Sequence, residues 1–291
     1  INIGSPSKER SISLELGNWN KTIDINESRT IWYKTSFLLD QQQSTLVLAK
    51  ERFESFSSNP MEYHFPSKFQ GSLFQYQAKH KRANSSGIKA AIIREKGVNG
   101  DREMAYSMFL AGFDVKDIHM TDLTTGKEDL TDVNFIVFVG GFSNSDVLGS
   151  AKGWAGAFKY NQKAKEALEN FYSRKDTLSL GVCNGCQLMM ELGLIDKTKG
   201  PRPMLHNNSG KFESNYITVN IPENNSVMLG SLSGSRLGIY VAHGEGKFDI
   251  SEGDYNLIMT YTSADYPTNP NGSTLNTAGV VSSDGRHLAM M

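Results

Sequence analysis

The most constraining feature of this sequence is a seven-residue stretch, Gly181–Gln187, that reads Gly-Val-Cys-Asn-Gly-Cys-Gln. A short apolar run, Thr177–Leu180, precedes it, and a helix-like run, Leu188–Leu192, follows it. The two glycines that flank Cys183 predict a turn so tight that a Cβ at either one would clash. The stretch therefore predicts a strand, a sharp turn and a helix, with Cys183 in a strained backbone at the head of the helix.

Cys183 is our candidate nucleophile, because a helix N-terminus with its free N–H groups should lower the pKa of a thiol. Other interpretations stay open at this point. A cysteine at a strand end is often a small core residue. Cys183 and Cys186 also form a Cys-x-x-C pair, which is typical of redox pairs and of half a zinc site. Zinc would need two more ligands, and the six histidines are scattered; a redox pair would leave Gly181 and Gln187 unexplained.

Composition limits the class of protein. The 291 residues suffice for one large domain, or for one domain with a piece of another. Thirty basic and 31 acidic residues give a formal net charge of −1, so nothing favours nucleic acid or an anionic membrane as a partner. No run approaches the roughly 18 apolar residues of a membrane span. Two cysteines three residues apart cannot build a disulfide framework, so we expect a cytoplasmic protein.

The chain divides into two segments of different character. Residues 1–84 contain a strand-like run, Ser11–Leu16, and a helix-like run, Ile31–Phe56, which Ser57–Pro60 should end. The stretch Lys79–Gly87 is basic at its start and rich in Ser and Gly at its end, as in a linker. Both ends of the sequence look cut, so we expect it to be part of a longer polypeptide.

From residue 85 to residue 291, short apolar runs alternate with amphipathic helices. Ala90–Ile93 and Phe135–Val139 predict buried strands, and Asp101–Ala111 predicts a helix that Gly112 ends. A second helical stripe comprises Ala164, Ala167, Leu168, Phe171 and Tyr172. Such alternation predicts an α/β fold with a flavodoxin-like, mostly parallel sheet and helices on both faces, preceded by a partial α+β segment. Further strands are predicted at Tyr216–Val219, Gly238–Val241, Leu257–Tyr261 and His287–Met291.

A thiolate that attacks an amide or ester needs two donors for the developing oxyanion. One donor should be the backbone N–H of Asn184, the residue after the nucleophile. The second should come from the loop Gly140–Ser143, which follows a predicted strand at the same sheet edge, where ligands bind in such folds. We therefore predict an oxyanion hole made by Gly141 and Asn184.

The general base is less clear from the residues alone. His243 lies at a predicted strand end with Glu245 two residues on, so the two could complete a Cys-His-Glu triad. A histidine that is only hydrogen-bonded in a loop is an equally good interpretation. We expect His119 in a solvated loop and His287 at the start of a strand that leaves a hairpin.

Several stretches together resemble class I glutamine amidotransferases, and among them the amidotransferase domain of a large synthetase of purine biosynthesis. The resemblance covers about residues 88–291. The stretches that carry it are Gly181–Gln187, Arg94–Ala105, Gly140–Ser143, Asp146–Ala155, His243–Gly246, Tyr266–Pro267, Asn269–Ser273 and Asp284–Ala289.

The resemblance implies that Cys183 attacks the side-chain amide of glutamine, and that the glutamyl thioester is then hydrolysed. Glutamine would be held by Gly140, Phe142 and Gln187, with a pocket wall of Asn208, Ser209, His243 and Gly244. The released ammonia would pass to a synthetase portion of the same polypeptide or complex. ATP and magnesium would bind in that portion, so we expect no metal or cofactor in this chain.

Two departures from the family pattern matter. The family's catalytic His and Glu follow the strand that ends here at Met290–Met291, so the sequence as given lacks them and His243 becomes a pocket residue. Asn144 and Ser145 stand where the family has an aromatic and a small residue. Two alternatives remain: a cysteine hydrolase or peptidase on a similar sheet, and a catalytically incomplete structural fragment.

Overall fold

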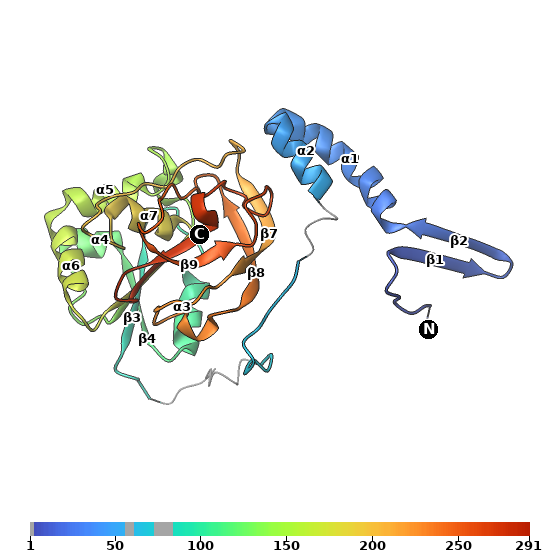
Figure 1. The fold of residues 1–291 in the computed structure, drawn as a ribbon. Coiled ribbons are helices and arrows are strands. Elements are labelled where there is room, and N and C mark those ends of the chain that lie inside the picture. Colours follow the sequence, from blue (N-terminus) through green and yellow to red (C-terminus); the bar gives the residue numbers. More distant parts are fainter. Residues whose placement is uncertain (1–2, 56–60, 73–83) are drawn as a thin grey trace. The chain divides into compact units, whose positions relative to one another are not determined.

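A computed structural model describes residues 3–55, 61–72 and 84–291 of the chain (Figure 1). The chain forms two compact units, residues 1–60 and 61–291. The predicted break at Ser57–Pro60 lies outside the described residues, as does the start of the predicted linker, Lys79–Ala83. The boundary expected at residue 84 stays a prediction.

The first unit contains a β-hairpin and two helices. The strand predicted at Ser11–Leu16 is confirmed as β1 (Ser11–Leu16). It pairs antiparallel with β2 (Trp19–Asp24), which was not predicted. The helix predicted over Ile31–Phe56 is wrong in its bounds, because two helices cover this region, α1 (Ile25–Gln43) and α2 (Leu46–Glu54). The break arises because the Thr45 side chain accepts a hydrogen bond from the backbone N–H of Leu48 (3.2 Å) and so starts a new helix.

Among the residues that the structure describes, the second unit is built on a nine-stranded sheet with the order β4-β3-β5-β6-β11-β10-β9-β7-β8. Strands β4 to β11 in this order pair in parallel, and the remaining pairs are antiparallel. The predicted parallel-rich α/β fold is therefore confirmed. The strands are β3 (Lys89–Arg94), β4 (Asp114–His119), β5 (Phe135–Phe138), β6 (Leu178–Val182), β7 (Glu213–Asn220), β8 (Arg236–His243), β9 (Asn256–Tyr261), β10 (Thr277–Val281) and β11 (His287–Met290).

Helices cover both faces of this sheet. Along β3, Ala91 and Ile93 pack in a core cluster with residues of four helices, α4 to α7, whereas Ala90 and Ile92 pack on the other face with residues of α3. This alternation follows from the two-residue period of a strand. The helices are α3 (Asp101–Leu110), α4 (Met120–Thr125), α5 (Lys152–Tyr160), α6 (Gln162–Ser173) and α7 (Asn184–Leu192), with short 3-10 segments at Ser143–Asp146, Gly230–Leu232 and Thr274–Asn276. None of the helices in the described ranges is long and apolar enough to span a membrane.

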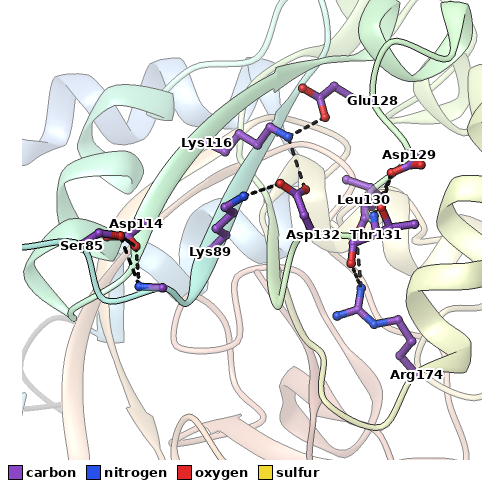
Figure 2. A network of polar contacts seen from close by, with 11 residues as sticks. Ser85, Lys89, Asp114, Lys116, Glu128, Asp129, Leu130, Thr131, Asp132 and Arg174 are labelled. Carbon is purple, nitrogen blue, oxygen red and sulfur yellow. Dashed lines mark hydrogen bonds and ion pairs between the residues drawn. The ribbon is translucent and has the colours of Figure 1, made fainter.

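A polar network holds the start of the parallel strands together (Figure 2). Lys89 of β3 and Lys116 of β4 both bond to Asp132, and Lys116 also bonds to Glu128 at 2.6 Å. The hydrogen bond from Lys89 lowers the pKa of the Asp132 carboxyl, which keeps it charged between the two lysines. These charges neutralise one another near the amino ends of the parallel strands, whereas Cys183 lies at their carboxyl ends.

Strand β11 lies at the centre of the sheet and joins its two halves. It pairs in parallel with β6 and antiparallel with β10. Beyond the end of β6, the backbone N–H of Cys183 donates to the carbonyl of Met290 (2.9 Å). The carboxyl end of β11 therefore lies beside the predicted nucleophile.

Candidate active site

Cys183 lies in the predicted elbow between β6 and α7. Its backbone is in a strained region, with φ 53° and ψ −108°. A Cβ on Gly181 would lie 2.5 Å from the carbonyl oxygen of Gly185, and a Cβ on Gly185 would lie 2.5 Å from the carbonyl carbon of Phe138. Both glycines are therefore needed, and the predicted turn is confirmed.

The two predicted oxyanion donors converge on the sulfur of Cys183. The carbonyl of Gly140 accepts a bond from the N–H of Asn99 (2.9 Å). Because N–H and C=O point in opposite directions across a trans peptide, the N–H of Gly141 faces away from Asn99. That N–H and the N–H of Asn184 both donate toward the Cys183 thiol. The geometry is that of a site with two backbone donors around one nucleophile.

A second glycine contact fixes the loop that carries Gly141. Its φ is 129°, and a Cβ there would lie 2.5 Å from the Cα of Val98. The N–H of Phe142 donates to the carbonyl of Gly97 (2.9 Å), so the two loops are held together on both sides of Gly141. Gly97 is a site residue that our sequence analysis did not single out.

The expectation that the helix terminus lowers the pKa of Cys183 is wrong for this structure. Burial raises the pKa of the thiol, and the charge of nearby Asp146 raises it further. The N–H groups of Asn184 and Gly141 lower it, but they do not outweigh burial. If Cys183 is the nucleophile, a partner that accepts the thiol proton would therefore favour attack at neutral pH.

The redox and zinc interpretations find no support in the geometry. Cys183 and Cys186 are both free thiols, and Cys186 is fully buried against the core. Burial raises the pKa of Cys186 well above its ordinary value. Within the described ranges, no three His, Cys, Asp or Glu side chains gather as metal ligands would.

A Cys-His-Glu triad with His243 and Glu245 is not formed. The Glu245 carboxylate accepts from the backbone N–H of Ser150 (3.3 and 3.4 Å) instead of from the His243 ring. Neither ring nitrogen of His243 has a hydrogen-bond partner in the part of the chain that the structure describes. Burial lowers the pKa of His243 to about 4, and the neighbouring Asn271 offsets only part of this effect. His243 is therefore neutral at pH 7 and lacks the carboxylate that would orient it.

The other two histidines that we considered have structural roles. His119 does not lie in a solvated loop but ends β4 and caps α4, where its Nδ1 accepts from the N–H of Thr121 (3.2 Å). His287 starts β11, as expected, and its Nδ1 lies 2.9 Å from the hydroxyl of Ser179. His287 thus lies at the amino end of β11, away from Cys183, and His119 lies at the carboxyl end of β4, three strands away from β6 in the sheet.

The predicted glutamine-binding residues fall into two groups. Gln187 is buried and bonded within the protein, as described below, whereas Asn208 is exposed and accepts from the Nζ of Lys247 (3.0 Å). Ser209 is buried, and its hydroxyl has no partner among the described residues. Phe142 is half-exposed, with its ring 6.0 Å from that of Phe212.

Sequence reasoning missed Asn207, which is buried next to the predicted wall residues. Its side chain donates to the carbonyl of His243 (2.6 Å) and accepts from the N–H of Gly246 (3.1 Å). Its backbone N–H donates to the carbonyl of Gly244 (2.9 Å). Asn207 thus holds the turn that carries two predicted wall residues. Only its neighbour Asn208 was singled out, and no spacing in the sequence distinguishes the two.

Comparisons with known proteins define the class. Residues 87–291 match the family described as CobB/CobQ-like glutamine amidotransferase domain. The chain belongs to this family of glutamine amidotransferases.

The same comparisons point to one kind of enzyme. The chain is 39% identical, over 89% of its length, to phosphoribosylformylglycinamidine synthase of Drosophila melanogaster, and 39% identical, over 92%, to the Homo sapiens protein of that name. The matches cover 20% and 22% of those proteins, so the chain spans about a fifth of their length. The solved structure of PurLQS from Thermotoga maritima matches 70% of this chain and 86% of that one, with a TM-score of 0.57 at 25% identity. The resemblance recognised in the sequence is confirmed, while the roles of single site residues stay predictions.

Proposed function

We propose that the second unit is the glutaminase portion of a phosphoribosylformylglycinamidine synthase, a glutamine-dependent carbon–nitrogen ligase of purine biosynthesis. The observation that carries this proposal is the convergence of the Gly141 and Asn184 N–H groups on Cys183 in a glycine-bounded elbow. The relatives that match most of the chain, and the family that it belongs to, support the same activity.

In this proposal the Cys183 thiolate attacks the side-chain amide carbon of glutamine. The two N–H groups stabilise the oxyanion, and a proton transferred to the nitrogen allows ammonia to leave. Water then hydrolyses the thioester to glutamate. Glutamine would rest against Gly140, Phe142 and the wall formed by Asn208, Ser209, His243 and Gly244.

In this proposal the base is the histidine that, in the family, follows the strand corresponding to β11. His243 is a poor candidate because its pKa is about 4 and no carboxylate orients it. The carbonyl of Met290 accepts from the Cys183 N–H at 2.9 Å, so the chain after β11 leaves the sheet beside the thiol. A histidine and a glutamate at that point, as in the family, would reach Cys183.

Ammonia would pass to the synthetase portion, which lies outside this sequence. There ATP, with magnesium, would activate the formyl oxygen of formylglycinamide ribonucleotide, and ammonia would replace that oxygen to give formylglycinamidine ribonucleotide. We place the enzyme in the cytoplasm, with glutamine and the synthetase portion as its partners and without nucleic acid or membrane.

The test is Cys183→Ala in the complete polypeptide. We expect glutamine-dependent synthesis to be lost and ammonia-dependent synthesis to remain, because only the thiol is removed. Glutamine should also protect Cys183 of the unaltered protein from alkylation by iodoacetamide. Retained glutamine-dependent synthesis would disprove the role of Cys183, and absence of protection by glutamine would favour a cysteine hydrolase or peptidase of other specificity.

A further inference from the structure

Three buried side-chain amides connect two segments of the candidate site. One segment is the loop Gly140–Ser143, which carries the predicted oxyanion donor Gly141 and is called the oxyanion loop below. The other is the turn His243–Gly246, which carries two residues of the predicted pocket wall. The three amides belong to Asn184, Gln187 and Asn207, whose residues are 0%, 5% and 3% exposed. We propose that these amides form a relay that positions the oxyanion loop, and that Gln187 acts as a positioning residue and not as a ligand of the substrate. This inference rests on the glutaminase function proposed above.

The first link joins the elbow helix to the oxyanion loop. The Asn184 Oδ1 accepts from the backbone N–H of Ser143 (3.1 Å), and the Asn184 Nδ2 donates to the Gln187 Oε1 (2.9 Å). Asn184 thus offers its backbone N–H to the oxyanion while its side chain holds the loop that provides the other donor.

That loop needs such a restraint because its backbone is strained. Immediately after Ser143, three residues in succession adopt left-handed conformations: Asn144 (φ 52°), Ser145 (φ 58°) and Asp146 (φ 47°). Each such residue other than glycine costs on the order of 1 kcal/mol, so the segment would relax if it were not held. The bond from Ser143 to Asn184 lies at the boundary between this segment and Gly141.

The second link joins the elbow helix to the turn His243–Gly246. The Gln187 Nε2 donates to the carbonyl of Glu245 (2.8 Å). On the other side of the turn, Asn207 bonds to the carbonyl of His243 and to the N–H of Gly246. The oxygen and the nitrogen of the Gln187 amide therefore each have a protein partner, one in α7 and one in the turn, as a positioning residue requires.

The consequence is a mechanical path between substrate and oxyanion hole. Glutamine bound against the wall at His243 and Gly244 would stabilise the turn His243–Gly246. Through the bonds of Gln187 and Asn184, the stabilised turn would also fix the position of Ser143. A broken relay should therefore leave binding nearly intact and misplace the Gly141 N–H, which acts only as charge develops.

The test compares Gln187→Met with Gln162→Met in the complete polypeptide. Gln162 is exposed on α6 and bonds only to Glu166 among the described residues, so its variant controls for the substitution itself. For Gln187→Met, we expect kcat for glutamate release to fall about 10- to 100-fold and KM to change less than about 3-fold. A KM about tenfold higher with kcat retained would show that Gln187 binds glutamine, and would overturn the relay.

A second readout does not depend on glutamine turnover. The rate of Cys183 alkylation by iodoacetamide, measured against pH by mass spectrometry, reports the thiolate. We expect Gln187→Met to slow alkylation at pH 7 by about 3-fold or more, because the Gly141 N–H no longer supports the thiolate. An unchanged profile would overturn the relay even if the protein proved not to hydrolyse glutamine, whereas lack of turnover by the unaltered protein would refute only the proposed function.

Folding is controlled within the same experiment. Cys186 is fully buried, so its alkylation would report a variant that has unfolded. If Gln187→Met unfolds, Asn207→Asp serves instead, because it keeps the acceptor for Gly246 and loses the bonds that the amide donates to the carbonyls of His243 and Lys211. The same fall in kcat with unchanged KM is expected, and unchanged kcat in Asn207→Asp would overturn the relay.

Discussion

Replacement of Gly185 by alanine tests whether helix α7 can pack against the sheet only when position 185 carries no side chain. The new Cβ would lie 2.5 Å from the carbonyl carbon and 2.8 Å from the Cβ of Phe138, and closer still to the Phe138 carbonyl oxygen. Phe138 is on β5, which pairs with β3 on one side and β6 on the other. Its ring is packed against Trp154 and Phe158, so neither its backbone nor its side chain can move aside.

The cost follows from this immobility. An extra methyl group in a packed core costs about 1–3 kcal/mol where neighbouring side chains can adjust. Here the overlap is with backbone in the centre of the sheet, so we expect Gly185→Ala to lower the free energy of unfolding by about 3–5 kcal/mol. A shift of α7 by about 1 Å would also displace Cys183, which should reduce turnover by about 100-fold.

The assay is urea unfolding followed by a pulse of alkylating reagent. Cys186 is fully buried, so its alkylation measures the unfolded fraction of this unit. Gly156→Ala is the matched control, because the nearest atom to its new Cβ is the Tyr160 Cδ2 at 3.8 Å. Alanine within α5 should stabilise by about 0.5–1 kcal/mol. A loss below about 1 kcal/mol for Gly185→Ala would refute the argument.

Three further predictions follow from the same geometry. Ser145→Gly should raise the free energy of unfolding by about 0.5–1 kcal/mol in the same assay, because glycine tolerates its φ of 58°; a loss would show that this backbone is not strained. Gly141→Ala should reduce glutamate release by at least about 100-fold, since its Cβ would lie 2.5 Å from the Cα of Val98; normal kcat would count against Gly141 as an oxyanion donor. Burial lowers the pKa of His243 and His287 from 6.5 to about 4, so both are neutral when folded and protonate more readily when unfolded. The free energy of unfolding should therefore be highest above pH 6.5 and should fall by about 3 kcal/mol per histidine toward pH 4. A His287→Asn variant that shows the same pH dependence as the unaltered protein in urea unfolding would contradict this reasoning.

The buried parallel strands and the turn at Cys183 could be predicted because each is determined by residues that are close together in the sequence. Continuous apolar runs identified β3 and β5, and the glycine spacing identified the turn at Cys183. Strand β4 was missed because it lies at the edge of the sheet, where Asp114, Lys116 and Asp117 stay partly solvated and interrupt the apolar run. The helix α5 was missed because its sequence contains two glycines, which are poor helix formers.

The site could be predicted in part for the same reason. Cys183, Asn184 and Gly141 come from a turn and a loop whose chemistry is local. Glu245 was paired with His243 on spacing alone, but its carboxylate bonds to Ser150, which is 95 residues away in the chain. Contacts of this kind depend on how separate segments pack, and a single sequence carries no periodicity that reveals them.

The central position of β11 has a consequence for how the protein is made. Strands β3 to β6 and strands β7 to β10 each form a contiguous part of the sheet, and β11 lies between β6 and β10. Cys183 and the oxyanion loop follow strands of the first part, whereas the turn at His243 follows a strand of the second. On the ribosome, residues 287–290 emerge after every other described strand, so the sheet cannot close until then. The thiol and the turn at His243 are therefore brought together only after β11 has been made, and a nascent chain that carries Cys183 but not yet β11 has no complete site.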